Sequence, residues 1–161
     1  DFSPGNYPGA TGDIIGVVVN GLGFLNGDWG LWDGGTWILE YSTSWLDDYG
    51  KNPQFANERI HKGRVTSQVA AVLRPTRFQV FPAWDMTLPM SVSYGIDGEQ
   101  PPQGTVTHEE LGNASIGVAF KIDEACDVEA RYSAYFGPTD NGTTGPLNDR
   151  DNVSFTIKRT F

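Results

Sequence analysis

The chain has 161 residues, the size of one ordinary domain, and carries a net charge of −9 with 19% charged residues. Because this composition offers no cationic surface that could release counterions from a phosphate backbone, we expect no nucleic acid among its partners. The 20 glycines, 10 prolines and 12% aromatic residues favour strands and turns over helices.

The N-terminal half contains three β-like runs. The first, from Asp13 to Leu25, has an ambiguous phase, whereas the second alternates clearly from Trp37 to Trp45. The third extends from Thr66 to Val80 and changes phase along its length. Because Pro75 lies within it and cannot donate to a ladder, we expect a β-bulge or a break there.

Four further runs alternate with a period of two: Met86 to Ile96, Ala114 to Ile122, Val128 to Phe136 and Val153 to Phe161. This period is typical of a strand with one apolar and one polar face. Asp123 and Glu124 are expected to form a hairpin turn between two of these strands. The total is about seven strands, and no apolar stretch reaches the ~18 residues of a membrane helix.

The connections alternate in length along the chain. Those at 26–34, 82–85 and 123–124 are short, and those at 48–65, 98–112 and 138–150 are long and polar. Outer-membrane barrels have short turns at one end and long loops at the other, and their strands need about 9–11 residues to cross a bilayer. We therefore predict an all-β antiparallel meander that forms part of a transmembrane β-barrel. A soluble β-sandwich, whose core would be the apolar face, is the alternative.

In a barrel the polar face of these strands lines the lumen. The candidate lumen-lining residues are all charged: Lys121, Asp127, Glu129, Arg131 and Lys158. They could form a wall that sets ion selectivity. Alternatively, they pair across strands and only satisfy one another.

No constellation supports an enzyme. The chain has no GxSxG elbow, and its two histidines, His61 and His108, are far apart in loops without HExxH spacing. Cys126 is the single cysteine, and the loop from Pro138 to Asp151 lacks the calcium-loop pattern. We therefore expect no catalytic residues, metal or cofactor. The five tryptophans fit interfacial anchors or, alternatively, a sugar-stacking platform.

The last strand, NVSFTIKRTF, has apolar residues at Val153, Phe155, Ile157 and Phe161. It resembles the assembly signal of bacterial outer-membrane barrels, although Arg159 departs from that pattern. Longer stretches resemble the C-terminal part of a proteobacterial outer-membrane family, the domain of unknown function 1302. These stretches are VNGLGFLNGDWGLWDGGTWILEYS, RFQVFPAWDMTLPMSVSYGIDG and DRDNVSFTIKRTF.

The resemblance implies a bacterial outer-membrane location and a barrel of several hundred residues, of which 1–161 would be a single C-terminal segment. An odd number of strands supports a fragment, because bacterial single-chain barrels have an even number. The implied partners are the lipid bilayer with lipopolysaccharide, the barrel-assembly machinery, the remaining barrel or other subunits, and a transport complex. The expected function is a non-enzymatic porin-like channel or an export partner for lipids or hydrophobic compounds. A secreted lectin-like β-sandwich is the alternative.

Overall fold

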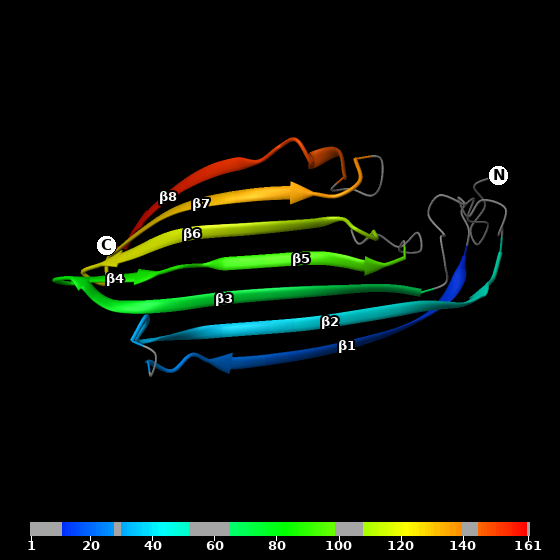
Figure 1. Cartoon of the computed structure of the whole chain (residues 1–161), viewed down its shortest axis with the longest axis horizontal. Helices are drawn as coiled ribbons and strands as arrows, with labels where there is room; N and C mark the ends of the chain where they lie inside the picture. The colour runs from blue at the N-terminus through cyan, green and yellow to red at the C-terminus, as the bar shows by residue number, and fades with distance from the viewer. Residues whose placement is uncertain (1–10, 28–29, 52–64, 99–107, 140–144, 161) are drawn as a thin grey trace.

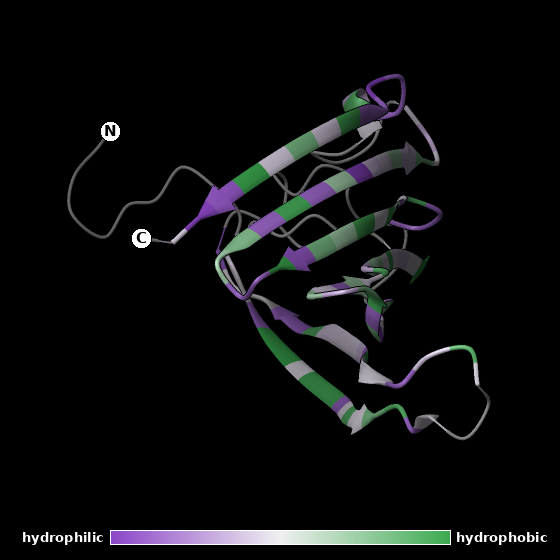
Figure 2. Ribbon diagram, turned by 90° about the vertical axis from the view of Figure 1, so that its left-hand side faces the viewer, coloured by the Kyte–Doolittle hydropathy of each residue, from purple (hydrophilic) through white to green (hydrophobic). Residues whose placement is uncertain are grey.

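The computed structural model describes residues 11–27, 30–51, 65–98, 108–139 and 145–160. They form one antiparallel eight-stranded sheet that curves along its width (Figures 1 and 2). The strands are β1 (Gly12–Phe24), β2 (Gly34–Tyr49), β3 (Val65–Phe81), β4 (Trp84–Thr87), β5 (Met90–Asp97), β6 (Gly112–Ile122), β7 (Cys126–Phe136) and β8 (Asn152–Arg159). One short 3-10 helix, η3 (Gly145–Leu147), precedes β8.

Each strand lies beside its neighbour in sequence, so the predicted all-β antiparallel meander is confirmed. The described residues contain no second sheet packed on the first, which differs from the sandwich alternative. Strands β1 and β8 are the two edges and do not pair with each other, so the described sheet is open. None of the described helical segments is long and apolar enough to cross a membrane.

Strands β4 and β5 together make one crossing of the sheet. Thr76 pairs with Thr87 and Leu73 pairs with Met90, so both segments keep one register against β3. They also keep one register against β6, where Thr87 faces Ala119 and Met90 faces Ile116. Because β4 and β5 count as one, the eight strands make seven crossings. This number agrees with the seven apolar runs of the sequence.

The interruption between β4 and β5 arises from two prolines. Pro75 accepts a hydrogen bond from the Leu88 N–H at 3.0 Å but has no N–H to return to Leu88. Pro89 likewise accepts from Gly117 N–H at 2.8 Å and cannot donate back. The expectation of a break in the strand that contains Pro75 is therefore wrong, because β3 is continuous. The N–H that Pro75 lacks instead interrupts the neighbouring strand, between β4 and β5.

The phase change of β3 lies further along the chain. Its register against β4 shifts between Arg77 and Phe81, where the backbone of Gln79 has a φ of 51°. The Asp85 carboxylate accepts a hydrogen bond from Gln79 N–H at 2.9 Å and closes this bulge. The alternation in the sequence indicated the irregularity correctly but not its position.

The two ends of the sheet have connections of different length. The turns β1–β2, β3–β4 and β6–β7 join strand ends at one end of the sheet. The connections β2–β3, β5–β6 and β7–β8 start and finish at the other end (Figure 1). A short turn joins β6 to β7, where Asp123 and Glu124 have φ values of 48° and 55°. The Ala125 N–H donates to the Ile122 carbonyl at 3.0 Å, so these residues form the hairpin turn that the sequence predicts.

Paired positions place apolar side chains from every strand on a common face of the sheet, here called the apolar face. One cross-strand row illustrates it: Trp37, Leu73, Met90, Ile116, Tyr132 and Val153. Only Leu46 and Leu111 are buried among the described hydrophobic residues. The strands thus form a sheet without a hydrophobic core between protein layers.

The accessible surface is correspondingly large. The chain exposes 10931 Å². A compact monomer of 17.6 kDa would expose about 7,900 Å² by the usual size scaling. The chain is therefore less compact than a globular monomer of its mass.

Glycines make room for aromatic rings on the apolar face. The Trp37 ring lies over Gly21 and Gly23 of β1, and a Cβ at Gly23 would stand 2.5 Å from it. Gly112 accommodates Phe136 in the same way, and the Phe136 ring stacks on Tyr94 with centroids 6.1 Å apart. These glycines obscured the phase of β1 in the sequence, because a strand normally places large side chains on its packed face.

We expect Gly112→Ala to destabilise the sheet by about 1–3 kcal/mol, because its Cβ would stand 2.3 Å from the Phe136 ring and 2.7 Å from the Ser93 carbonyl oxygen. Gly16→Ala is the matched control, since the nearest atoms to its Cβ are 3.9 Å away. Urea unfolding followed by tryptophan fluorescence measures both variants. Equal midpoints for the two would show that Gly112 has no packing role.

Candidate functional site

The candidate site is the face opposite the apolar face, here called the polar face. Its middle is rich in hydroxyl groups that bond across strands: Ser91 to Ser115 at 2.8 Å, Thr76 to Thr87 at 3.0 Å and Ser44 to Thr66 at 2.7 Å. Figure 2 shows the resulting alternation of hydrophilic and hydrophobic residues along the ribbons. The two faces therefore differ most clearly in chemistry over β3 to β8.

Three of the five predicted lumen-lining residues lie in a single cross-strand row. Lys121 is directly opposite Asp127, and Asp127 is directly opposite Lys158. Asp85 of β4 extends this row, because it is opposite Lys121 on the other side. The row Asp85, Lys121, Asp127 and Lys158, here called the charge ladder, alternates in sign across four strands near the short turns.

The other two predicted residues pair with each other. Arg131 Nε lies 2.6 Å from Glu129 Oε1 on the same strand, and the two side chains are 38% and 28% exposed. A half-exposed pair of this kind contributes at most about 1 kcal/mol. Glu129 and Arg131 therefore pair within one strand rather than across strands. The lumen-lining role of the five residues stays a prediction.

Asp85 is a member that sequence reasoning missed. It lies in the stretch assigned to a turn, although it has the same parity as Thr87 and so belongs to the polar side of the same alternation. Extending the alternation two residues backward would have found it. Its carboxylate also holds the bulge of β3, which fixes its position in the charge ladder.

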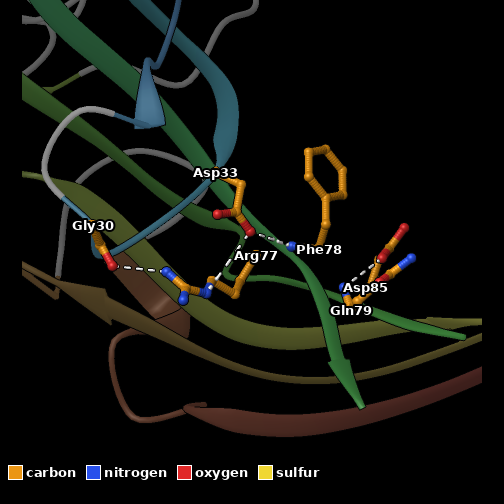
Figure 3. A network of polar contacts seen from close by, with 6 residues as sticks. All are labelled: Gly30, Asp33, Arg77, Phe78, Gln79 and Asp85. Carbon is orange, nitrogen blue, oxygen red and sulfur yellow. Dashed lines mark hydrogen bonds and ion pairs between the residues drawn. The ribbon is translucent and has the colours of Figure 1, made fainter. Parts of the chain in front are cut away.

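A polar network holds the short-turn end of the sheet together (Figure 3). Arg77 Nη1 donates to the Gly30 carbonyl at 2.7 Å, and its Nε lies 3.8 Å from the Asp33 carboxylate. The same carboxylate accepts the Phe78 N–H at 2.7 Å. Arg77 has the parity of the apolar face. The network explains how a cation is accommodated at the margin of that face.

Aromatic side chains lie near both ends of the apolar face. Trp84 packs edge-on against Phe120 and Phe81, with centroids 5.7 and 6.0 Å apart, at the short-turn end. Tyr94 and Phe136 form the stack described above toward the long connections. This arrangement is compatible with the predicted interfacial anchors.

The remaining described tryptophans do not gather into one platform. Trp37 covers the glycines of β1, Trp45 pairs with Val65 toward the long connections, and Trp32 Nε1 donates to the Asn26 carbonyl at 3.1 Å. Trp29 lies outside the described residues.

The residues of the expected assembly signal share one face of β8. Val153, Phe155 and Ile157 are 62%, 77% and 75% exposed, on the edge of the sheet. Arg159 is on the same face, opposite Cys126. Phe161 lies outside the described residues.

No group of three or more potential metal ligands occurs within the part of the chain that the structure describes. Of the acidic loop residues considered for calcium, Asp151 is used in the fold: it accepts the Tyr132 hydroxyl at 2.5 Å and the Tyr135 N–H at 3.2 Å. His61 and Asp140 lie outside the described residues.

Residues 5–161 match the family described as protein of unknown function (DUF1302). No curated protein and no solved structure matches the chain.

We expect Lys121→Glu to lower the free energy of unfolding by about 0.5–2 kcal/mol, because it places three acids side by side in the charge ladder. Lys121→Met, which removes the charge without reversing it, should cost less. Urea unfolding at low and at 1 M salt measures both, and screening should reduce the difference. A difference that persists at high salt would show that the row is not coupled electrostatically.

Proposed function

Because the chain belongs to the DUF1302 family, we propose that its sheet is part of the wall of a β-barrel in the bacterial outer membrane. In this proposal the apolar face contacts lipid and the polar face lines a lumen. The protein acts without enzymatic chemistry, as a porin-like channel or as an export partner for lipids or hydrophobic compounds.

One observation carries the proposal: an apolar face that extends over all seven crossings is exposed, with only Leu46 and Leu111 buried among the described hydrophobic residues. Exposed apolar patches on soluble monomers rarely exceed a few hundred Å², so this face requires an apolar environment. A bilayer supplies one over the whole width of the sheet.

Strand length agrees with a bilayer crossing. Strands β6 and β7 have 11 residues each. Ten steps of ~3.3 Å give about 33 Å along the strand, which a tilt of about 40° projects to ~25 Å. This is the height of the apolar band on outer-membrane barrels.

The open edges of the sheet, β1 and β8, need pairing partners in a bilayer. Each unpaired backbone group of β1 and β8 would cost several kcal/mol in lipid. We therefore propose that further strands, from the rest of a larger barrel or from other subunits, pair with both edges. The short turns would face the periplasm and the long connections the exterior, where lipopolysaccharide lies.

The exposed apolar row of β8 suits recognition during assembly. The exposed apolar row consists of Val153, Phe155 and Ile157. It lies beside an unpaired strand edge, which can pair with another strand. We propose that the barrel-assembly machinery reads this row.

We expect the protein to fractionate with membranes and to require detergent for extraction. Its folded form should migrate differently on a gel from the heated form, since closed barrels resist unfolding by detergent alone. Monodisperse extraction into plain buffer would contradict the proposal, because a bilayer-facing surface could not remain dispersed in water.

Substitutions at two adjacent residues of β5 test which face of the sheet contacts lipid. We expect Val92→Lys to lower stability in lipid vesicles by about 2–4 kcal/mol, because Val92 belongs to the apolar face. Ser93→Lys, on the polar face, is the matched control and should change stability by less than about 1 kcal/mol. Urea unfolding from vesicles measures both. A larger cost for Ser93→Lys would reverse the assignment of the faces.

A further inference from the structure

The polar face is not uniform, because its β1–β3 part carries a second apolar surface. Leu22 of β1 is opposite Ile38 of β2, and Ile38 is opposite Val72 of β3. Phe24 lies two residues beyond Leu22 on the same face and is 75% exposed. Leu22, Phe24, Ile38 and Val72 are here called the inner patch. Strand β1 is therefore apolar on both of its faces.

The inner patch ends sharply at the next strand. Val72 is followed across the sheet by Ser91, Ser115 and Ser133, which occupy the same row. One row thus consists of three apolar residues and then three hydroxyls. Packing against the bilayer explains the apolar face but not this boundary, because the inner patch lies on the other side of the sheet.

A cation lies at one end of the inner patch and an acid at the other. Arg74 follows Val72 by two residues on the same face and is exposed. Its opposite residue on β2 is Thr36, and no ion pair within the described part of the chain includes Arg74. Glu40 lies beyond Ile38 in the opposite direction, opposite Ala70. Along β2, about 13 Å separates the row of Arg74 from the row of Glu40.

The surface is also hollowed next to the inner patch. A shallow hollow is lined by Val18, Ser42 and Gln68, together with Glu40, toward the long connections. Val18 is 58% exposed and continues the apolar surface of β1 beyond Asn20. An extended apolar chain would therefore find contact area along β1, beside a hollow that is lined mainly by polar residues of β2 and β3.

We propose that the inner patch binds an amphipathic anion with a single acyl chain, such as a long-chain carboxylate, and this inference rests on the proposed function. The carboxylate pairs with the Arg74 guanidinium, which is suited to bidentate carboxylate recognition. The methylene chain lies on Leu22, Ile38 and Val72. Glu40 repels the carboxylate at the far end, so the ligand has one orientation. The lumen would then provide an apolar track on one side and hydroxyl groups on the other.

Binding of a fluorescent long-chain fatty acid to the full chain, in detergent micelles or vesicles, tests the proposal. We expect saturable binding that weakens about tenfold in Arg74→Gln and less in Arg74→Lys, which keeps the charge but loses the bidentate geometry. Ile38→Ser should weaken it as well, because it removes contact with the acyl chain. Arg150→Gln is the matched control, since Arg150 lies 71% exposed in the connection before β8. The methyl ester of the same fatty acid should bind more weakly than the acid.

Unchanged affinity in Arg74→Gln, or equal binding of the methyl ester, would overturn the proposal. If Ile38→Ser leaves fatty-acid binding unchanged but alters the mass measured by light scattering, the inner patch is an interface between copies of the chain instead. Membrane insertion of each variant is measured separately by detergent extraction. A chain that inserts but binds no fatty acid refutes this inference alone, whereas a chain that does not insert refutes the proposed function.

Discussion

A single β-sheet has two faces, and an alternating sequence makes only one of them compatible with water. In this protein the apolar face has no protein layer against it within the described residues, and the hydrophobic effect makes such an arrangement unstable unless another apolar medium covers it. Every other feature of the structure depends on this constraint. The long strands and the aromatic side chains near both ends agree with a sheet that needs a partner on that face.

The details of the apolar face are consistent with tight packing parallel to the sheet rather than between sheets. Trp37 fills the space above two glycines, and Phe136 occupies the space that Gly112 leaves beside Tyr94. Rings that lie flat along a sheet give it a smooth outer surface. On the opposite face, hydroxyl pairs bond across strands and the charge ladder places opposite charges on neighbouring strands. The inner patch is the exception that the proposed amphipathic ligand explains.

The period-two pattern was sufficient to predict the meander, the hairpin at Asp123 and Glu124, and the face of each charged residue on β6 to β8. It failed where prolines, glycines or a bulge disturb the period-two alternation of side chains. The effect of Pro75 falls on the neighbouring strand, because a ladder hydrogen bond has two partners and only one of them is visible in a local sequence. Likewise Asp85 was missed because its stretch was assigned to a turn, and the glycines under Trp37 obscured the two-sided character of β1. Which residues become cross-strand neighbours depends on register, which the hydrophobic pattern restricts and the turns fix.

The most direct test of the central claim is a spin-label scan along β6, with labels at consecutive positions from Asn113 to Lys121 and Cys126 replaced by serine. In reconstituted outer-membrane lipid, we expect collision rates with oxygen, which concentrates in lipid, to peak at Ala114, Ile116, Val118 and Phe120. Collision rates with a water-soluble nickel complex should peak at the positions between them. Oxygen and nickel accessibilities that rise and fall together, or a reversed alternation, would contradict the account, because the apolar face would then not be the face that contacts lipid.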